Sequence, residues 1–124
     1  MGSIKKDFAA ASREQRIKYC RFYIEEASAA GKSKKKIYDE LARIGADEEV
    51  LDEAFYQIKE EIPSEMEKAE SVAEKLIRQA NNTLSSSVLR KILYKLAYMG
   101  YEEEIISEIA EKLRFEYGLE DIFS

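Results

Sequence analysis

Residues 34–58 read KKKIYDELARIGADEEVLDEAFYQI, and residues 89–113 read LRKILYKLAYMGYEEEIISEIAEKL. The two stretches align without a gap at an offset of 55 positions. Eight positions of the first stretch are identical in the second: Lys36, Ile37, Leu41, Ala42, Gly45, Glu48, Glu49 and Glu53. A repeat of this length indicates one supersecondary unit used twice, with the copies stacked so that each covers the apolar face of the other. Such arrays present extended surfaces, so the repeat favours a binding protein over an enzyme.

Hydrophobic spacing predicts three helices in the first copy, over residues 13–62. The first should run from about residue 13 to residue 30. Ser33 is expected to cap the second helix, and Gly45 to end it in a left-handed conformation. Asp47 should cap the third helix, whose acidic first turn suits a helix N-terminus. The buried face of this third helix is expected to comprise Val50, Leu51, Ala54, Phe55 and Ile58.

The same plan predicts three helices in the second copy, over residues 63–116. Pro63 marks the border between the copies. Ser64 and Glu67 should form a capping box at the start of the first helix. The second and third helices are expected to meet at Gly100, as their equivalents meet in the first copy.

The ends of the chain fall outside the repeat. Residues 1–12 are expected to be an N-terminal extension or an expression scar, adding helix ahead of the first unit. Residues 117–124 are expected to form a short acidic tail. No segment alternates with period two over a useful length, so no strand is predicted. The predicted fold class is all-α: two tandem three-helix repeats stacked into a short, elongated, curved array.

Composition argues against several kinds of site. The chain of 124 residues has no histidine and a single cysteine, Cys20. The usual zinc sets, histidine-based catalysis and an internal disulfide are therefore excluded. The acidic stretch 47–53 lacks the glycine-turned loop of an EF-hand. We expect no catalytic site, no metal, no cofactor and no small-molecule substrate, and we expect Cys20 to pack as a small apolar residue.

The sequence also bears on location. No apolar run approaches the roughly 18–20 residues of a membrane span, and no secretory leader is visible. A single thiol fits a reducing compartment. The chain is expected to be cytoplasmic, with no membrane partner.

Charge alternates along the chain in step with the repeat. The net charge of −5 divides into +5 over residues 1–45, −9 over 46–74, +5 over 75–100 and −6 over 101–124. We therefore expect the first two helices of each copy to be its basic part and the third helix to be acidic. Phosphates would repel an acidic third helix, so reading of duplex DNA by that helix is disfavoured.

Two basic helices in register could follow a helical polyanion or the groove of a filament, with salt-dependent affinity. Aromatic side chains among cations suit base stacking or a protein interface. A solubilising surface, with lysines paired to Asp39 and Glu40, is the open alternative. For Tyr19 and Tyr23 we favour an ordinary place at the edge of the core. The candidate contact residues are Arg16, Arg21, Lys32, Lys34, Lys35, Lys36, Tyr38, Arg90, Lys91, Tyr94 and Lys95.

Several short segments follow one another in a fixed order: YCRFYIE at 19–25, GKS at 31–33, IYDEL at 37–41, Gly45, RKILYKL at 90–96 and MGY at 99–101. Their order and spacing resemble the RecX family of bacterial RecA regulatory proteins. That family shows an aromatic-Ala-Arg-x-Tyr helix, a Gly-Lys-Gly/Ser turn, a helix ending near Glu-Leu, and a glycine before an acidic helix. The resemblance covers about residues 14–115.

The resemblance implies three tandem three-helix repeats, of which this chain matches the second and third. It implies a non-enzymatic regulator that lies in the groove of the RecA–DNA filament and contacts recombinase subunits. Such a protein would inhibit strand exchange and ATP hydrolysis, and so modulate DNA recombination, DNA repair and the SOS response. Single-stranded DNA is a further possible partner, through the basic helices.

Two other functions stay open on the residues alone. One is a sequence-nonspecific nucleic-acid-binding helical module without a recombinase partner. The other is a helical adaptor whose apolar ends dock a missing repeat or another subunit.

Overall fold

The fold is entirely helical over the residues that the structure describes. The structure is a computed structural model, and it describes residues 2–118. No strand occurs within that range, so the predicted all-α class is confirmed. Of the expected tail, only residues 117 and 118 are described. The helices are α1 (Gly2–Ala10), α2 (Arg13–Ala29), α3 (Lys34–Arg43), α4 (Glu48–Ile58), α5 (Glu65–Gln79), α6 (Ser86–Tyr98) and α7 (Glu103–Glu116).

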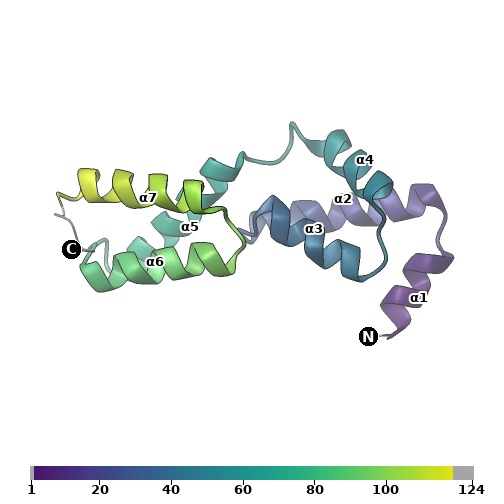
Figure 1. Cartoon of the computed structure of the whole chain (residues 1–124), viewed down its shortest axis with the longest axis horizontal. Coiled ribbons are helices and arrows are strands. Elements are labelled where there is room, and N and C mark those ends of the chain that lie inside the picture. Colours follow the sequence, from purple (N-terminus) through teal and green to yellow (C-terminus); the bar gives the residue numbers. More distant parts are fainter. Residues whose placement is uncertain (1, 119–124) are drawn as a thin grey trace.

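Two helical trios each enclose their own core. Within α2–α4 and within α5–α7, every helix packs against the other two. Figure 1 shows the trios end to end along the long axis of the molecule. The buried apolar residues form two clusters with no shared member. The expectation that each copy covers the other's apolar face is therefore wrong. The largest fully buried apolar side chains are Ile24, Ile37, Leu41 and Leu51 in one trio, and Leu89, Ile92, Leu96 and Ile109 in the other.

Helix ends lie where their capping residues predicted them. The Ser33 hydroxyl accepts the backbone N–H of Lys36, and the Asp47 carboxylate accepts that of Val50. Ser64 and Glu67 form the predicted capping box at the start of α5. The expected buried face of α4 is buried at all five positions. Local signals thus set the limits of the helices, because a cap satisfies backbone groups of the adjacent turn.

The first helix differs from expectation. α1 and α2 are separate helices, because residues 11 and 12 are not helical. Ser12 caps α2 and forms a capping box with Gln15. Phe8 is only 6% exposed and belongs to the core of the first trio. The Arg16 guanidinium donates to the carbonyl oxygens of Phe8 at 3.1 Å and Ala9 at 2.7 Å. α1 therefore covers the free end of the first trio, and Arg16 holds it there.

The trios meet where two turns come together, residues 30–33 and residues 99–101, which we call the joint. The backbone N–H of Ser33 donates to the carbonyl oxygen of Met99 at 3.0 Å. The buried hydroxyl of Tyr101 donates to the carbonyl oxygen of Gly31 at 2.7 Å. The buried ammonium of Lys68 donates to the carbonyl oxygen of Lys32 at 3.0 Å. These hydrogen bonds fix the direction of one trio relative to the other.

The joint places helices of like charge in line. In Figure 1, α6 and α3 follow one another along one long side of the molecule, and α7 and α4 lie along the other. The C-terminal end of α6 meets the start of α3 at the joint. The basic helices α3 and α6 therefore share one side, and the acidic helices α4 and α7 share the opposite side. The expectation that the first helix of the second copy is basic is wrong, because α5 carries four glutamates against two lysines and one arginine.

Candidate functional site

The outer surface of α6 is cationic and aromatic. The stretch 75–100 contains no acidic residue, and the core side of α6 is taken by Leu89, Ile92 and Leu96. Helical spacing then turns the polar and aromatic positions outward. Tyr94 and Tyr98 are 77% and 70% exposed. Arg90, Lys91 and Lys95 are exposed on the same helix.

Lys36 extends this surface across the joint. Its Nζ donates to the carbonyl oxygen of Tyr98 at 3.1 Å and lies 4.5 Å from the centre of the Tyr98 ring. Lys95 lies 5.8 Å from the centre of the same ring. A cation from one trio and a ring from the other thus form a single contact. We call the combined surface the basic face; its members are Lys35, Lys36, Arg90, Lys91, Tyr94, Lys95 and Tyr98.

Lys32 is committed to its own trio. Its ammonium pairs with Glu40 at 2.9 Å, and the Tyr23 hydroxyl donates to the same carboxylate at 2.7 Å. The hydrogen bond to Glu40 raises the pKa of Lys32. This pairing is the one that the alternative of a self-paired surface predicted for Glu40. Lys32 is therefore paired within its own trio, and its role as an external contact stays a prediction.

Tyr38 is not the exposed contact that the sequence suggested. Its ring is half-buried against the first core and stacks on Phe55 with 6.5 Å between ring centres. The Lys34 ammonium lies 5.0 Å from the centre of the Phe55 ring. The gap-free alignment pairs Tyr38 with Leu93, which is half-buried too. Tyr94 instead pairs with the exposed Asp39, and it is exposed as expected.

The candidates on α2 also have hydrogen-bond partners elsewhere in the N-terminal half of the protein. Arg16 is bound to the end of α1, as described above. Arg21 donates to the Gln57 side chain on α4 at 2.8 Å. Five of the eleven candidates therefore lie off the basic face: Arg16, Arg21, Lys32, Lys34 and Tyr38.

Tyr98 was missing from the candidates, although it is central to the basic face. Its position four residues after Tyr94 places both rings on one side of a helix, and this spacing was the signal available. Its contact with Lys36 joins positions 62 residues apart and had no signal in the sequence.

The remaining candidate features belong to packing. Cys20 is fully buried, and burial raises the pKa of its thiol to about 11, so the group is an inert apolar residue. Tyr23 lies at the edge of the core as expected, but Glu40 binds its hydroxyl. Tyr19 contacts Phe8 edge-on at 5.9 Å and is 40% exposed, so the interpretation as core edge holds only in part.

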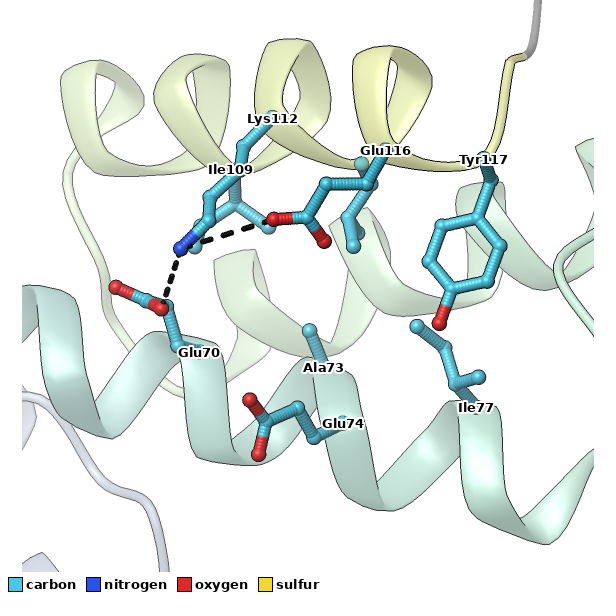
Figure 2. A pocket seen from close by; sticks show the side chains of 9 residues that line it. Glu70, Ala73, Glu74, Ile77, Ile109, Lys112, Glu116 and Tyr117 are labelled. Carbon is cyan, nitrogen blue, oxygen red and sulfur yellow. Dashed lines mark hydrogen bonds and ion pairs between the residues drawn. The ribbon is translucent and has the colours of Figure 1, made fainter. Parts of the chain in front are cut away.

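A groove of about 140 Å³ lies on the acidic side, between α5 and α7 (Figure 2). Its floor is apolar, with Ala73 and Ile77 from α5 and Ile109 from α7. Lys112 spans it, with its Nζ 2.7 Å from Glu70 and 4.0 Å from Glu116. Lys112 thus pairs with two of the three carboxylates that line the groove, and Glu74 is the third. In the described part of the chain, no three acidic or thiol groups gather in a set that could hold a metal ion.

Comparison of the chain with family models, curated proteins and solved structures finds no match in any of the three. Within residues 2–118, none of the helices combines the length and apolar character that crossing a membrane requires.

Proposed function

We propose that this chain binds the RecA recombinase filament on DNA and restrains it, without a catalytic step of its own. Two lines of support bear on the proposal. The segments at 19–25, 31–33, 37–41 and 90–101 resemble the RecX family. The observation that carries the proposal is the alignment of α6 with α3 across the joint, which makes one basic face from two repeats.

The charge distribution suits a filament better than a free ligand. The basic face would lie toward the DNA, where each neutralised phosphate adds salt-dependent affinity. The acidic helices α4 and α7 would lie toward basic patches on recombinase subunits. Opposite charges on opposite sides let one elongated molecule lie between the polynucleotide and the protein. Restraint then follows from bridging neighbouring subunits, which opposes strand exchange and ATP turnover.

The test is ATP hydrolysis by RecA on single-stranded DNA, with this chain titrated in. We expect the rate to fall as the chain is added. A double variant of the basic face, Lys91→Glu with Lys95→Glu, is expected to weaken inhibition about tenfold or more, because each reversal repels phosphate. The matched control is Lys5→Glu with Lys6→Glu, which makes the same charge change on exposed positions of α1, away from the basic face.

The control variant is expected to inhibit like the unaltered chain. A hydrolysis rate that stays constant at saturating protein would overturn the proposed function. Equal loss of inhibition in both double variants would show that overall charge, and not the basic face, is responsible.

A further inference from the structure

We infer that Tyr94 and Tyr98 form a base-stacking site for single-stranded nucleic acid, and that Lys36 completes this site from the other trio. The inference rests on the proposed function, since it names the class of polynucleotide that the basic face takes. It also assigns a role to the joint, because the site exists only when the trios are held together.

The two rings are available to a ligand. Both are more than two-thirds exposed, and no ring–ring contact within the described residues involves either of them. They lie four residues apart, about 6 Å along the helix axis, so each can take a separate base. Stacking of a base on an aromatic side chain contributes about 1–3 kcal/mol and tolerates any base, because every base has a π face.

Positive charge surrounds the rings. Lys36 is held in place by its hydrogen bond to the Tyr98 carbonyl oxygen, and Lys95 lies near the same ring. Lys91 is exposed one turn before Lys95. No carboxylate occurs in the whole stretch 75–100 to repel a phosphate. Rings with flanking cations and no nearby anion on their helix are what single-strand binding surfaces require.

The chemistry selects single strands over duplex. In a duplex the faces of the bases are covered by their neighbours, so a side-chain ring cannot reach them. An unpaired strand leaves its bases free to turn toward Tyr94 and Tyr98. A double helix could meet the lysines of the basic face, but it would gain nothing from the tyrosines.

The chain offers a matched control pair on the opposite side. Tyr56 on α4 is 65% exposed, and Lys59 lies 4.7 Å from its ring centre. Lys59 and Tyr56 therefore form the same kind of contact, an ammonium over a tyrosine ring, as Lys36 and Tyr98. Its neighbours on the chain, however, are acidic, among them Asp52 and Glu60. A nonspecific effect of removing an exposed tyrosine would appear equally at Tyr56.

The experiment measures direct binding without recombinase, by fluorescence anisotropy with labelled oligothymidylate, an abasic strand of equal length and a duplex. We expect oligothymidylate to bind more tightly than either other probe. Tyr94→Ala and Tyr98→Ala should each weaken oligothymidylate binding about 5- to 150-fold and leave its salt dependence unchanged, since no charge is removed. Lys36→Gln should instead reduce the slope of log K against log salt by about 0.7. Tyr56→Ala should bind like the unaltered chain.

Several results would overturn the inference. Equal affinity for oligothymidylate and the abasic strand would show that charge alone binds. Equal losses at Tyr56 and Tyr98 would remove the site-specific role of the basic face. Circular dichroism of each variant checks that the fold is kept. This assay contains no RecA, so a negative result would overturn the stacking site and not the proposed function. The hydrolysis assay tests the proposed function separately.

Discussion

At the scale of single residues, the cluster of Lys32, Glu40 and Tyr23 shows how side chains of the first trio hold one another. One carboxylate accepts hydrogen bonds from an ammonium and a phenol on different elements. Burial acts to raise the pKa of Glu40, but the hydrogen bonds from Tyr23 and Lys32 outweigh it and hold this pKa below its ordinary value. The ionised carboxylate is therefore the form that stabilises the fold.

This cluster predicts a dependence of stability on pH. The unfolded chain takes up a proton at Glu40 first as the pH falls, because its pKa is the ordinary value of about 4.3. The stabilisation is complete above that pH and is lost as the pH falls through the lowered pKa of the folded chain. Glu40→Gln should cost about 1–2 kcal/mol at neutral pH and remove this part of the acid dependence. Urea unfolding at neutral pH and at about pH 3 measures both effects.

Glu25→Gln is the control for that measurement, since it neutralises an exposed carboxylate on α2. It should leave stability within about 0.5 kcal/mol of the unaltered chain. Equal losses for Glu25→Gln and Glu40→Gln at neutral pH would contradict the role given to the cluster.

At the scale of elements, the turn between the second and third helices of each trio has a glycine with positive φ, but the two turns have different surroundings. Gly45 and Gly100 occupy equivalent positions, with φ of +107° and +90°. A Cβ atom at Gly45 would meet only Phe8, at 3.8 Å. At Gly100 it would lie 2.5 Å from the Ser33 hydroxyl and 2.9 Å from the Lys36 Cβ. The second turn must have glycine for two reasons, its conformation and its place in the joint.

Alanine substitutions separate these two reasons. Gly45→Ala should cost about 1–2 kcal/mol, the strain of a left-handed conformation in a residue with a Cβ. Gly100→Ala carries the same strain and also pushes Ser33 and Lys36 away, so its loss should be larger. Urea unfolding compares the free energies, and a label pair across the joint reports the distance between the trios. Equal free energies of unfolding and an unchanged distance would show that the joint tolerates a methyl group.

At the scale of the whole molecule, two closed cores share one polar joint. A repeat whose copies shared a core would unfold as one body, since no copy could bury its apolar side alone. Here each trio buries its own leucines and isoleucines, and hydrogen bonds to backbone carbonyl groups couple the trios. A destabilising substitution in one core should therefore lower the stability mainly of that trio.

Ile37 and Ile92 test this expectation, because they are equivalent in the repeat and both are fully buried. Each substitution by alanine should cost about 2–5 kcal/mol through lost burial and the cavity left behind. Hydrogen exchange should show the loss of protection centred on α2–α4 for Ile37→Ala and on α5–α7 for Ile92→Ala. The same uniform loss along the chain in both variants would show that the joint makes the trios one cooperative unit.

The sequence by itself determined the number of helices in each trio, the caps at Ser33, Asp47 and Ser64, and the buried face of α4. These features depend on residues within one or two turns of each other, such as Ser64 with Glu67, so a linear pattern contains them. It did not separate α1 from α2, because one buried side chain, Phe8, makes too short a pattern. Nor did the sequence show that Tyr38 packs against the core, because its stacking partner Phe55 lies on another helix.

Only the tertiary structure decided which lysines turn outward and how the trios face each other. Lys32 and Lys36 are neighbours in one basic run, yet one pairs with Glu40 and the other reaches Tyr98 of the second trio. Four hydrogen bonds at the joint are accepted by carbonyl oxygens, those of Gly31, Lys32, Tyr98 and Met99. Every residue carries such a carbonyl group, so the sequence does not indicate which carbonyl groups will accept hydrogen bonds from the other trio.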